Sequence, residues 1–193
     1  MAEKRTEILR AARPILLRDG LGGTTLDRVV AEGRVSKMTL YRHFPSKEAL
    51  FEGLVTVMCE HMRDSLENAL STDIHKAAAN RLADELRVFT SALIEPDYLA
   101  LYRLTVADGW RLPDLARVFD RSGMRVIRQR IAELLEVGGV PTNKSRQAAA
   151  DVVALALGDA YQRALLGIVE DGDGEAFAQQ IEAAVTYGFS QTA

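Results

Sequence analysis

The sequence is poor in cysteine, in histidine and in long apolar runs. Its single cysteine, Cys59, cannot form an internal disulfide, which is typical of a protein kept in a reducing cytoplasm. No run of about 18 apolar residues is present, so we expect no membrane-spanning helix. The opening residues MAEKRTEILR lack the apolar stretch of a signal peptide, and none is expected. Because 48% of the residues are hydrophobic and 26% are charged, the chain should be a soluble, globular protein.

Groupings that carry catalysis or bind metals are also missing. His43, His61 and His75 are too far apart to form a helical metal-binding pair, and no cysteine or His-Glu cluster accompanies them. The glycine-rich residues 20–23 follow a helical pattern instead of a strand, which argues against a dinucleotide-binding loop. A small all-helical enzyme would need converging catalytic groups, and the sequence shows none. We therefore expect neither an enzyme nor a bound metal or cofactor.

Charge is divided unevenly along the chain. Residues 1–50 carry ten Lys and Arg against six Asp and Glu, whereas residues 51–193 carry 14 against 21. The overall charge of −3 therefore hides a basic first quarter. A basic segment joined to an acidic body suggests contact with nucleic acid at one end. Scattered charge on a solvated surface would give the same totals, so charge alone leaves both interpretations open.

Apolar residues recur with helical spacing throughout, and no strand-like alternation stands out, which predicts an all-α fold of about nine helices. The first helix should bury a face made of Ile8, Ala12, Ile15 and Leu16. Pro14 should kink or shorten this helix, because proline removes a backbone donor. The first helix should end near residues 19–23, and the others are expected at 26–33, 37–43, 47–70, 75–94, 98–109, 112–137, 143–169 and 173–190.

Two short amphipathic helices with a tight turn between them are predicted over residues 24–44. Thr25, Ser36 and Ser46 are suited to cap the second, third and fourth helices. In the third helix, Leu40 and Phe44 should point inward. This order of cap, helix, turn, cap and helix is typical of a helix-turn-helix. The side chains expected to contact base edges in the major groove are Lys37, Met38, Thr39, Arg42 and His43. Those expected to bind backbone phosphates are Tyr41 and Lys47.

This segment resembles the N-terminal domain of the TetR family of bacterial transcriptional regulators. The resemblance rests on residues 8–20, Thr25, 35–37, 39–41, Phe44, Ser46 and Lys47. Residues 98–137 resemble the ligand-domain segment of one TetR subgroup. The resemblance implies a cytoplasmic homodimer that binds a palindromic operator and answers to a small-molecule ligand. The candidate DNA-binding residues are Thr25, Arg34, Ser36, Lys37, Met38, Thr39, Tyr41, Arg42, His43 and Lys47.

The turn between the two helices departs from the family pattern. Where the family usually has Ala-Gly-Val, this chain has Gly33-Arg34-Val35. The displaced glycine predicts a left-handed backbone at Arg34, at a cost of roughly 1 kcal/mol. Pro14 is a second departure, since the family normally has an uninterrupted helix there.

Residues 146–169 are apolar almost all round, and such a helix must be covered on both sides. The chain's own core would supply one cover and a second subunit the other; the alternative is the central helix of a monomer. A dimer agrees with the resemblance, because two recognition helices must reach half-sites about 34 Å apart. The candidate interface residues are Ala154, Leu157, Gly158, Tyr161 and Leu165, with Phe177, Ile181 and Val185 from the last helix.

Aromatic and a few polar side chains in the middle helices would suit a small-molecule pocket. Each of them also fits an ordinary core position, and the resemblance transfers no pocket residue. The candidates are Phe89, Tyr102, Arg103, Trp110, Met124 and Tyr161.

The sequence therefore predicts a three-helix DNA-binding domain with a helix-turn-helix at residues 1–46. Residues 47–193 should form a larger helical domain for ligand binding and dimerisation. The first hypothesis is a dimeric transcriptional regulator, a repressor that a small-molecule ligand releases from its operator. The alternative is an effector-blind DNA-binding or protein-interaction module, whose middle domain would be packed without a pocket.

Overall fold

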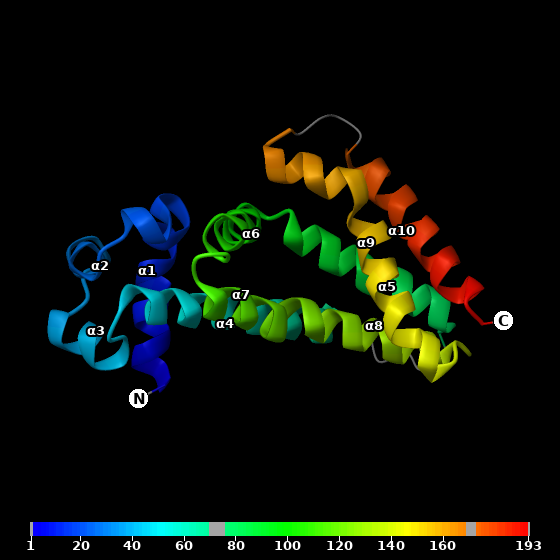
Figure 1. Ribbon diagram of the computed structural model, residues 1–193, viewed down its shortest axis with the longest axis horizontal. Helices are drawn as coiled ribbons and strands as arrows, with labels where there is room; N and C mark the ends of the chain where they lie inside the picture. The colour runs from blue at the N-terminus through cyan, green and yellow to red at the C-terminus, as the bar shows by residue number, and fades with distance from the viewer. Residues whose placement is uncertain (1, 70–75, 169–172, 193) are drawn as a thin grey trace. The chain divides into compact units, whose positions relative to one another are not determined.

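The computed structural model describes residues 2–69, 76–168 and 173–192, and every regular element in these ranges is helical (Figure 1). The all-α prediction is thus confirmed. The stretch predicted as one helix at 112–137 consists of three consecutive helical elements: α7 Pro113–Phe119, the π-helical turn η1 Asp120–Met124 and α8 Arg125–Val137. The elements are α1 Ala2–Gly23, α2 Leu26–Gly33, α3 Lys37–His43, α4 Lys47–Ala69, α5 Ala78–Leu93, α6 Pro96–Asp108, α7 Pro113–Phe119, η1 Asp120–Met124, α8 Arg125–Val137, α9 Thr142–Leu166 and α10 Asp173–Ser190.

The chain folds into two compact units, each made of two separate stretches. Unit 1 consists of Met1–Glu60 and Pro96–Ser122, and unit 2 of His61–Glu95 and Gly123–Ala193. Helix α4 therefore has residues in both units. Packing thus divides the chain after residues 60, 95 and 122. The boundary expected at residue 46, between a DNA-binding and a ligand-binding domain, stays a prediction.

One apolar core holds unit 1 together. The predicted inner face of α1, Ile8, Ala12, Ile15 and Leu16, is buried as expected. It packs with Leu40 of α3, with Phe44 just after α3 and with the apolar face of α4. Cys59 belongs to this core, and burial raises the pKa of its thiol to about 11, which agrees with a packing role. Later in the chain, α6 and α7 contribute Leu101, Leu115 and Val118.

Helix α1 runs on through Pro14, so the predicted shortening at the proline is wrong, and the break in the helix lies at Gly20. Pro14 lies inside the helix, whose dihedral angles leave the helical region at Gly20, with φ 65° and ψ −177°. Only glycine adopts this conformation without strain. A Cβ at Gly20 would also lie 3.0 Å from Leu104 Cδ2. The buried Thr24 hydroxyl donates to the Gly20 carbonyl at 2.7 Å, which gives that oxygen a partner at the break.

Unit 2 is a bundle in which α9 and α10 lie side by side and pack with α5 and α8 (Figure 1). It contains an ion pair whose carboxylate is buried and whose arginine is partly exposed. Glu85 of α5 is 2% exposed, and Arg130 of α8 donates to its carboxylate at 2.5 Å from Nε and 3.4 Å from Nη2. The apolar core comprises Leu82, Leu86, Phe89, Ile127, Ile131, Leu135, Val152, Val153, Ala156, Ile181 and Ala184, among others.

Helix α9 is broken at Gly158, where φ is 41° and ψ is −146°. The Gln180 side chain from α10 bonds the backbone at this break. With its amide nitrogen facing the Leu157 carbonyl, it donates there at 3.1 Å. Its oxygen then accepts from the nitrogens of Asp159 at 3.1 Å and Ala160 at 3.2 Å. Gln180 thereby pairs backbone groups that the break removes from the helical hydrogen-bond ladder.

Candidate DNA-binding surface

Helices α2 and α3 form the predicted helix-turn-helix, and most of its caps are as expected. The Arg28 nitrogen donates to the Thr25 hydroxyl at 3.2 Å, and the Ala49 nitrogen donates to the Ser46 hydroxyl at 3.1 Å. Ser36 precedes α3 in an extended conformation, but its side chain makes no capping bond, so that part of the prediction is wrong. With φ −61° and ψ 129°, its backbone still starts the helix, since its carbonyl accepts from Leu40 N at 2.9 Å.

The turn confirms the prediction for Arg34. Its φ of 52° and ψ of 37° lie in the left-handed region, and among the residues that the structure describes it is the one non-glycine with positive φ. The turn brings α3 to a defined angle against α2 at the expense of local strain.

Replacing Arg34 with glycine should therefore raise the free energy of unfolding by up to about 1 kcal/mol, because glycine has no Cβ to strain this conformation. Urea denaturation measures this change. Arg34→Ala is the matched control, since it removes the same side chain and keeps the Cβ. Equal stability of the two variants would contradict a strained turn.

Helix α3 has the two faces that the sequence predicts. Leu40 and Phe44 are buried, and the guanidinium of Arg5 from α1 lies 5.0 Å from the centre of the Phe44 ring. On the other side Met38 is 77% exposed. Lys37, Tyr41 and Arg42 are also exposed, while Thr39 and His43 are half-buried. An exposed methionine beside basic and hydroxyl groups is unfavourable in water but suits contact with base edges.

An ion pair joins the starts of α2 and α3. The Lys37 Nζ lies 2.7 Å from Asp27 Oδ1, and both side chains are largely exposed. The ammonium also lies 5.7 Å from the centre of the Tyr41 ring. The hydrogen bond with Asp27 raises the pKa of Lys37 above its usual value. The sequence analysis missed this pair, because residues ten apart face one another only once the turn is built.

Lys47 begins α4, and its ammonium donates to the Leu21 carbonyl at 2.9 Å. One of its three N–H groups is thus used to tie α4 to the end of α1. Contact of Lys47 with a DNA phosphate, which the sequence predicts, stays a proposal.

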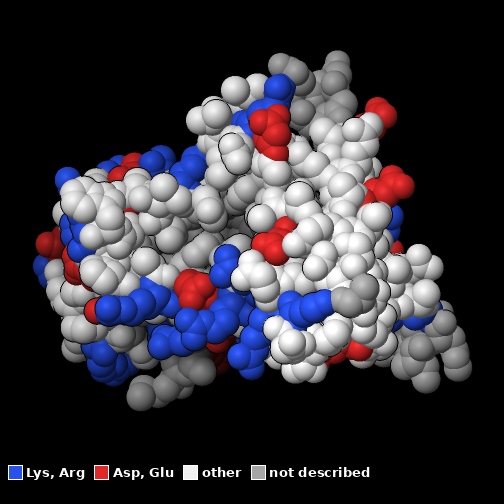
Figure 2. Space-filling model, turned by 45° about the vertical axis from the view of Figure 1, so that its right-hand side comes forward, with Lys and Arg blue, Asp and Glu red and all other residues white. Residues whose placement is uncertain are grey.

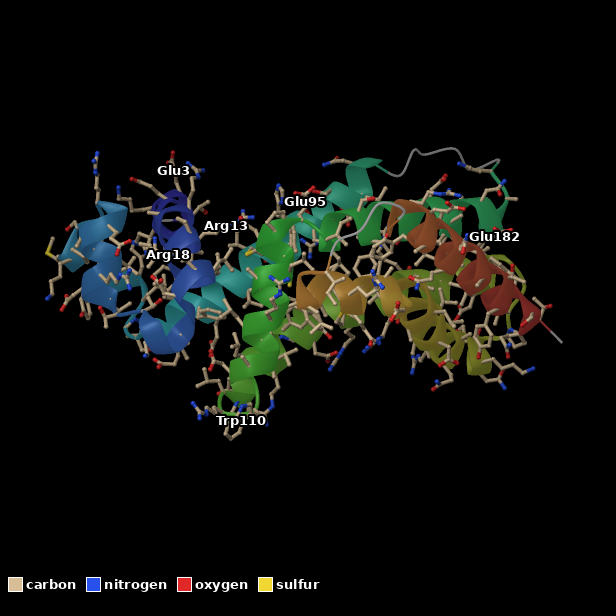
Figure 3. All side chains as sticks on the ribbon, turned by 90° about the horizontal axis from the view of Figure 1, so that it is seen from above. Glu3, Arg13, Arg18, Glu95, Trp110 and Glu182 are labelled. Carbon is tan, nitrogen blue, oxygen red and sulfur yellow. The ribbon has the colours of Figure 1, made fainter. Side chains whose placement is uncertain are left out.

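Four charged side chains fix α2 against α1. Arg18, labelled on α1 in Figure 3, lies 2.8 Å from Asp19 and 2.9 Å from Glu32 of α2. Arg28 lies 3.1 Å from Asp19 and 2.5 Å from Glu32. The hydrogen bond from Arg18 lowers the pKa of Asp19, and those from Arg28 and Arg18 lower that of Glu32. Both carboxylates therefore contribute stability at neutral pH that is lost as acid protonates them. Acidic and basic side chains touch at several places on the mostly white face in Figure 2.

The candidate pocket residues are divided between the two compact units. Tyr102, Arg103 and Trp110 belong to unit 1, whereas Phe89, Met124 and Tyr161 belong to unit 2. Tyr102 packs edge-on against Phe119, with ring centres 5.7 Å apart. Trp110 is 73% exposed, projects from the end of α6 (Figure 3) and cannot line an enclosed pocket within the chain. Phe89 and Tyr161 are buried, so a pocket in unit 2 stays a prediction that rests on them.

The candidate dimer residues divide between the core and the surface. Tyr161, Phe177 and Ile181 are buried in unit 2 itself. Ala154 is exposed, and Leu157, Gly158, Leu165 and Val185 are half-buried. Exposed apolar side chains that the prediction did not include are Leu155, Leu166 and Ile168. When a helix is apolar on all sides, its sequence does not show which face packs against its own chain and which against a partner.

Neither a metal centre nor a membrane helix emerges from the described ranges. Within them, no three His, Cys, Asp or Glu side chains are grouped so that they could hold a metal ion. No helix in those ranges has the length and apolar character needed to cross a membrane.

Two family models match the chain. One, described as bacterial regulatory proteins of the tetR family, covers residues 8–54, which include the whole helix-turn-helix. The other, described as the AefR-like transcriptional repressor C-terminal domain, covers residues 80–189.

The chain is similar in sequence to nucleoid occlusion factors SlmA of several bacteria. That of Vibrio campbellii is 32% identical over 142 residues, 69% of this chain and 61% of that protein. That of Photobacterium profundum is 38% identical over 82 residues, 41% of this chain and 40% of that protein. The chain thus spans about three fifths of the length of the Vibrio relative.

Solved structures share the fold over nearly the whole chain. A TetR-family protein from Mesorhizobium loti has a TM-score of 0.83 at 24% identity, covering 98% of this chain and 96% of that one. The flavonoid-responsive regulator FrrA has a TM-score of 0.79 at 29% identity, covering 98% and 97%.

Proposed function

Because the chain belongs to the TetR family of bacterial regulatory proteins, we propose that this DNA-binding regulator is a dimeric repressor that a small-molecule ligand releases from its operator. The outer face of α3 carries the proposal. Its exposed Lys37, Met38, Tyr41 and Arg42 form a surface of donors and apolar atoms supported by a buried inner face. Such a surface suits the major groove. Because bacterial chromosomal DNA lies in the cytoplasm, a regulator that binds it would act there.

The similarity of residues 80–189 to a repressor C-terminal domain supports the repressor part of the proposal. The flavonoid-responsive regulator of the same fold supports the ligand part. Helix α4 has residues in both compact units, so a ligand held in unit 2 would have a direct connection to the helix-turn-helix. Such a ligand must bind the DNA-free conformation more tightly than the DNA-bound one, because equal affinity shifts no equilibrium.

Dimerisation is supported by the apolar side chains exposed on α9. Leu155 and Leu166 present large apolar groups to solvent within a single chain. A second copy covering them would remove this unfavourable exposure and bring two α3 helices to one operator.

The named relatives favour a second candidate. Nucleoid occlusion factor is a name that refers to the nucleoid and not to a small molecule. An effector-blind DNA-binding or protein-interaction module is therefore the alternative function for this chain.

A mobility-shift titration on duplex DNA flanking the protein's own coding sequence tests DNA binding. We expect a discrete dimer complex whose affinity falls steeply as salt rises, since phosphate contacts release counterions. Absence of a complex on any tested flanking DNA, or binding insensitive to salt, would contradict the proposal. A panel of small aromatic compounds, flavonoids included, then separates the two candidates. Release of DNA by one of them favours the ligand-responsive repressor, and failure of the whole panel favours the effector-blind module.

A further inference from the structure

The guanidinium of an arginine from α1 is held beside the end of α3. Arg5 is half-buried, and its guanidinium carbon lies 5.0 Å from the centre of the Phe44 ring. Phe44 directly follows α3, so the start of α1 lies next to that end of the helix (Figure 1). Gly53 of α4 leaves the space that both groups fill, since a Cβ there would lie 2.8 Å from Phe44 Cε1 and 3.0 Å from Arg5 Nη2. Three parts of unit 1 thus fix the position of one cation.

This cation has no acidic partner. Within the residues that the structure describes, the Arg5 guanidinium makes no ion pair and no hydrogen bond. Two other cations of α1 are paired, because Lys4 Nζ lies 2.7 Å from Glu7 and Arg13 Nη2 lies 2.7 Å from Asp97. A partly desolvated charge is stabilised by an anion, and for Arg5 the described part of the chain supplies none.

The contact with Phe44 positions the guanidinium and leaves it able to donate. An aromatic ring attracts a cation electrostatically and offers no oxygen acceptor. A guanidinium has five N–H donors in a planar fork that fits two phosphate oxygens at once. Because the Arg5 side chain is already held in place, binding an anion costs it less conformational freedom than it would cost an unsupported arginine. A positioned guanidinium without a partner is suited to a phosphate.

The location of Arg5 suits the backbone that borders a major groove. Helix α3 has seven residues and is about 10 Å long, and the major groove is about 12 Å wide. When so short a helix enters the groove, its ends approach the phosphates on either side. The exposed outer face of α3 ends at Arg42, two residues before Phe44. A guanidinium that contacts Phe44 is therefore closer to the edge of the groove than to its floor.

We propose that Arg5 binds a backbone phosphate of DNA beside the end of α3, in addition to the phosphate contacts proposed for Tyr41 and Lys47. This inference rests on the DNA-binding role of the chain. Phe44 and Gly53 act as positioning residues for the guanidinium. Because a phosphate carries no sequence information, the contact strengthens binding to every sequence equally and fixes how the protein is seated on the duplex.

The first test compares wild-type protein with Arg5→Met, which keeps an unbranched side chain against Phe44 and removes the charge. Two duplexes are used, one selected from a random-sequence pool by the wild-type protein and one with that sequence scrambled. Fluorescence anisotropy gives Kd over a range of salt concentrations. For each subunit bound, Arg5→Met should weaken binding to both duplexes by about 3- to 10-fold and make the salt slope shallower by about 0.9.

Two further variants separate a phosphate contact from other effects. Arg10→Met removes the same charge from an exposed position of α1 and should change either Kd by less than about twofold. Arg5→Lys keeps the charge but lacks the fork, so it should keep the salt slope while binding more weakly than wild type. Loss of packing alone would not produce this difference in salt slope. Thermal unfolding checks that each variant is folded.

A second measurement locates the phosphate. Single methylphosphonates, each replacing one charged phosphate by a neutral group, are placed in turn along the selected duplex. At one position in each half-site, neutralisation should weaken binding of the wild type by about 3- to 10-fold and that of Arg5→Met by less than about twofold.

Three results would each overturn the inference while leaving DNA binding intact. They are an unchanged salt slope in Arg5→Met, an equal loss of affinity in Arg10→Met, and a scan in which no phosphate depends on Arg5. If the wild-type protein selects and binds no duplex at all, the DNA-binding role and this inference both fail.

Discussion

Arg130→Met should lower the free energy of unfolding by about 3–5 kcal/mol. Its partner Glu85 is 2% exposed and depends on Arg130 for its hydrogen bonds at 2.5 and 3.4 Å. Methionine would leave a buried carboxylate without a compensating charge. Urea denaturation of wild type and variant, analysed with a common slope, measures the difference.

The double variant Glu85→Leu with Arg130→Met is the matched control. Removing both charges leaves an apolar contact of similar volume, so its stability should return to within about 1–2 kcal/mol of wild type. Removing the charge of Glu85 should destabilise the protein less than removing that of Arg130. Glu85→Gln leaves Arg130 with access to solvent and to Glu67, 4.0 Å away, and should cost less than Arg130→Met. A double variant as unstable as Arg130→Met would show that packing, and not charge, dominates at this position.

Arg42→Ala should weaken binding to a selected duplex by about 5- to 150-fold for each half-site and relax the preference for one base. The side chain is exposed on the outer face of α3, and no ion pair holds it within the described residues. Truncating it therefore removes a donor from the DNA surface and little from the fold, so stability should change by less than about 0.5 kcal/mol. Anisotropy titrations on the selected duplex and its single-base variants measure both changes.

Tyr41→Phe provides the contrast. As a proposed phosphate contact, Tyr41 should matter equally for every sequence, so its loss should weaken binding without changing the preferred base. If Arg42→Ala also weakens all sequences equally, then Arg42 contacts the backbone, and its assignment to a base edge is wrong.

Local chemistry made much of the helix-turn-helix predictable. Thr25 and Ser46 cap helices because a short hydroxyl side chain can reach the free amides of the first turn, although the hydroxyl of Ser36 makes no such bond. The left-handed Arg34 followed from one displaced glycine. The inward Leu40 and Phe44 followed from helical spacing. Each of these depends on residues within a few positions of one another, which a sequence displays directly.

Features that depend on distant residues were not predictable. Pro14 was expected to kink or shorten α1, but the helix continues past it to a break at Gly20, whose positive φ suits glycine and whose Cα faces Leu104 of α6. Glu85 and Arg130 are 45 positions apart, and nothing in the sequence pairs them. Tyr161, Phe177 and Ile181 were expected at a dimer interface because their helices are apolar, yet the chain buries them itself. The spacing of apolar residues shows that a helix has an apolar face, but tertiary packing decides which neighbouring helix covers that face.

The interleaving of the two units along the chain governs the order in which this protein can fold. A nascent chain completes residues 61–95, which belong to unit 2, before it can supply the second stretch of unit 1. Until that stretch emerges from the ribosome, the core around the helix-turn-helix lacks Leu101 and Leu115, both almost fully buried in the finished protein. No single cut of the polypeptide releases either unit whole. An isolated N-terminal fragment would expose apolar surface to water, so the intact chain is the smallest piece suitable for study as a DNA-binding protein.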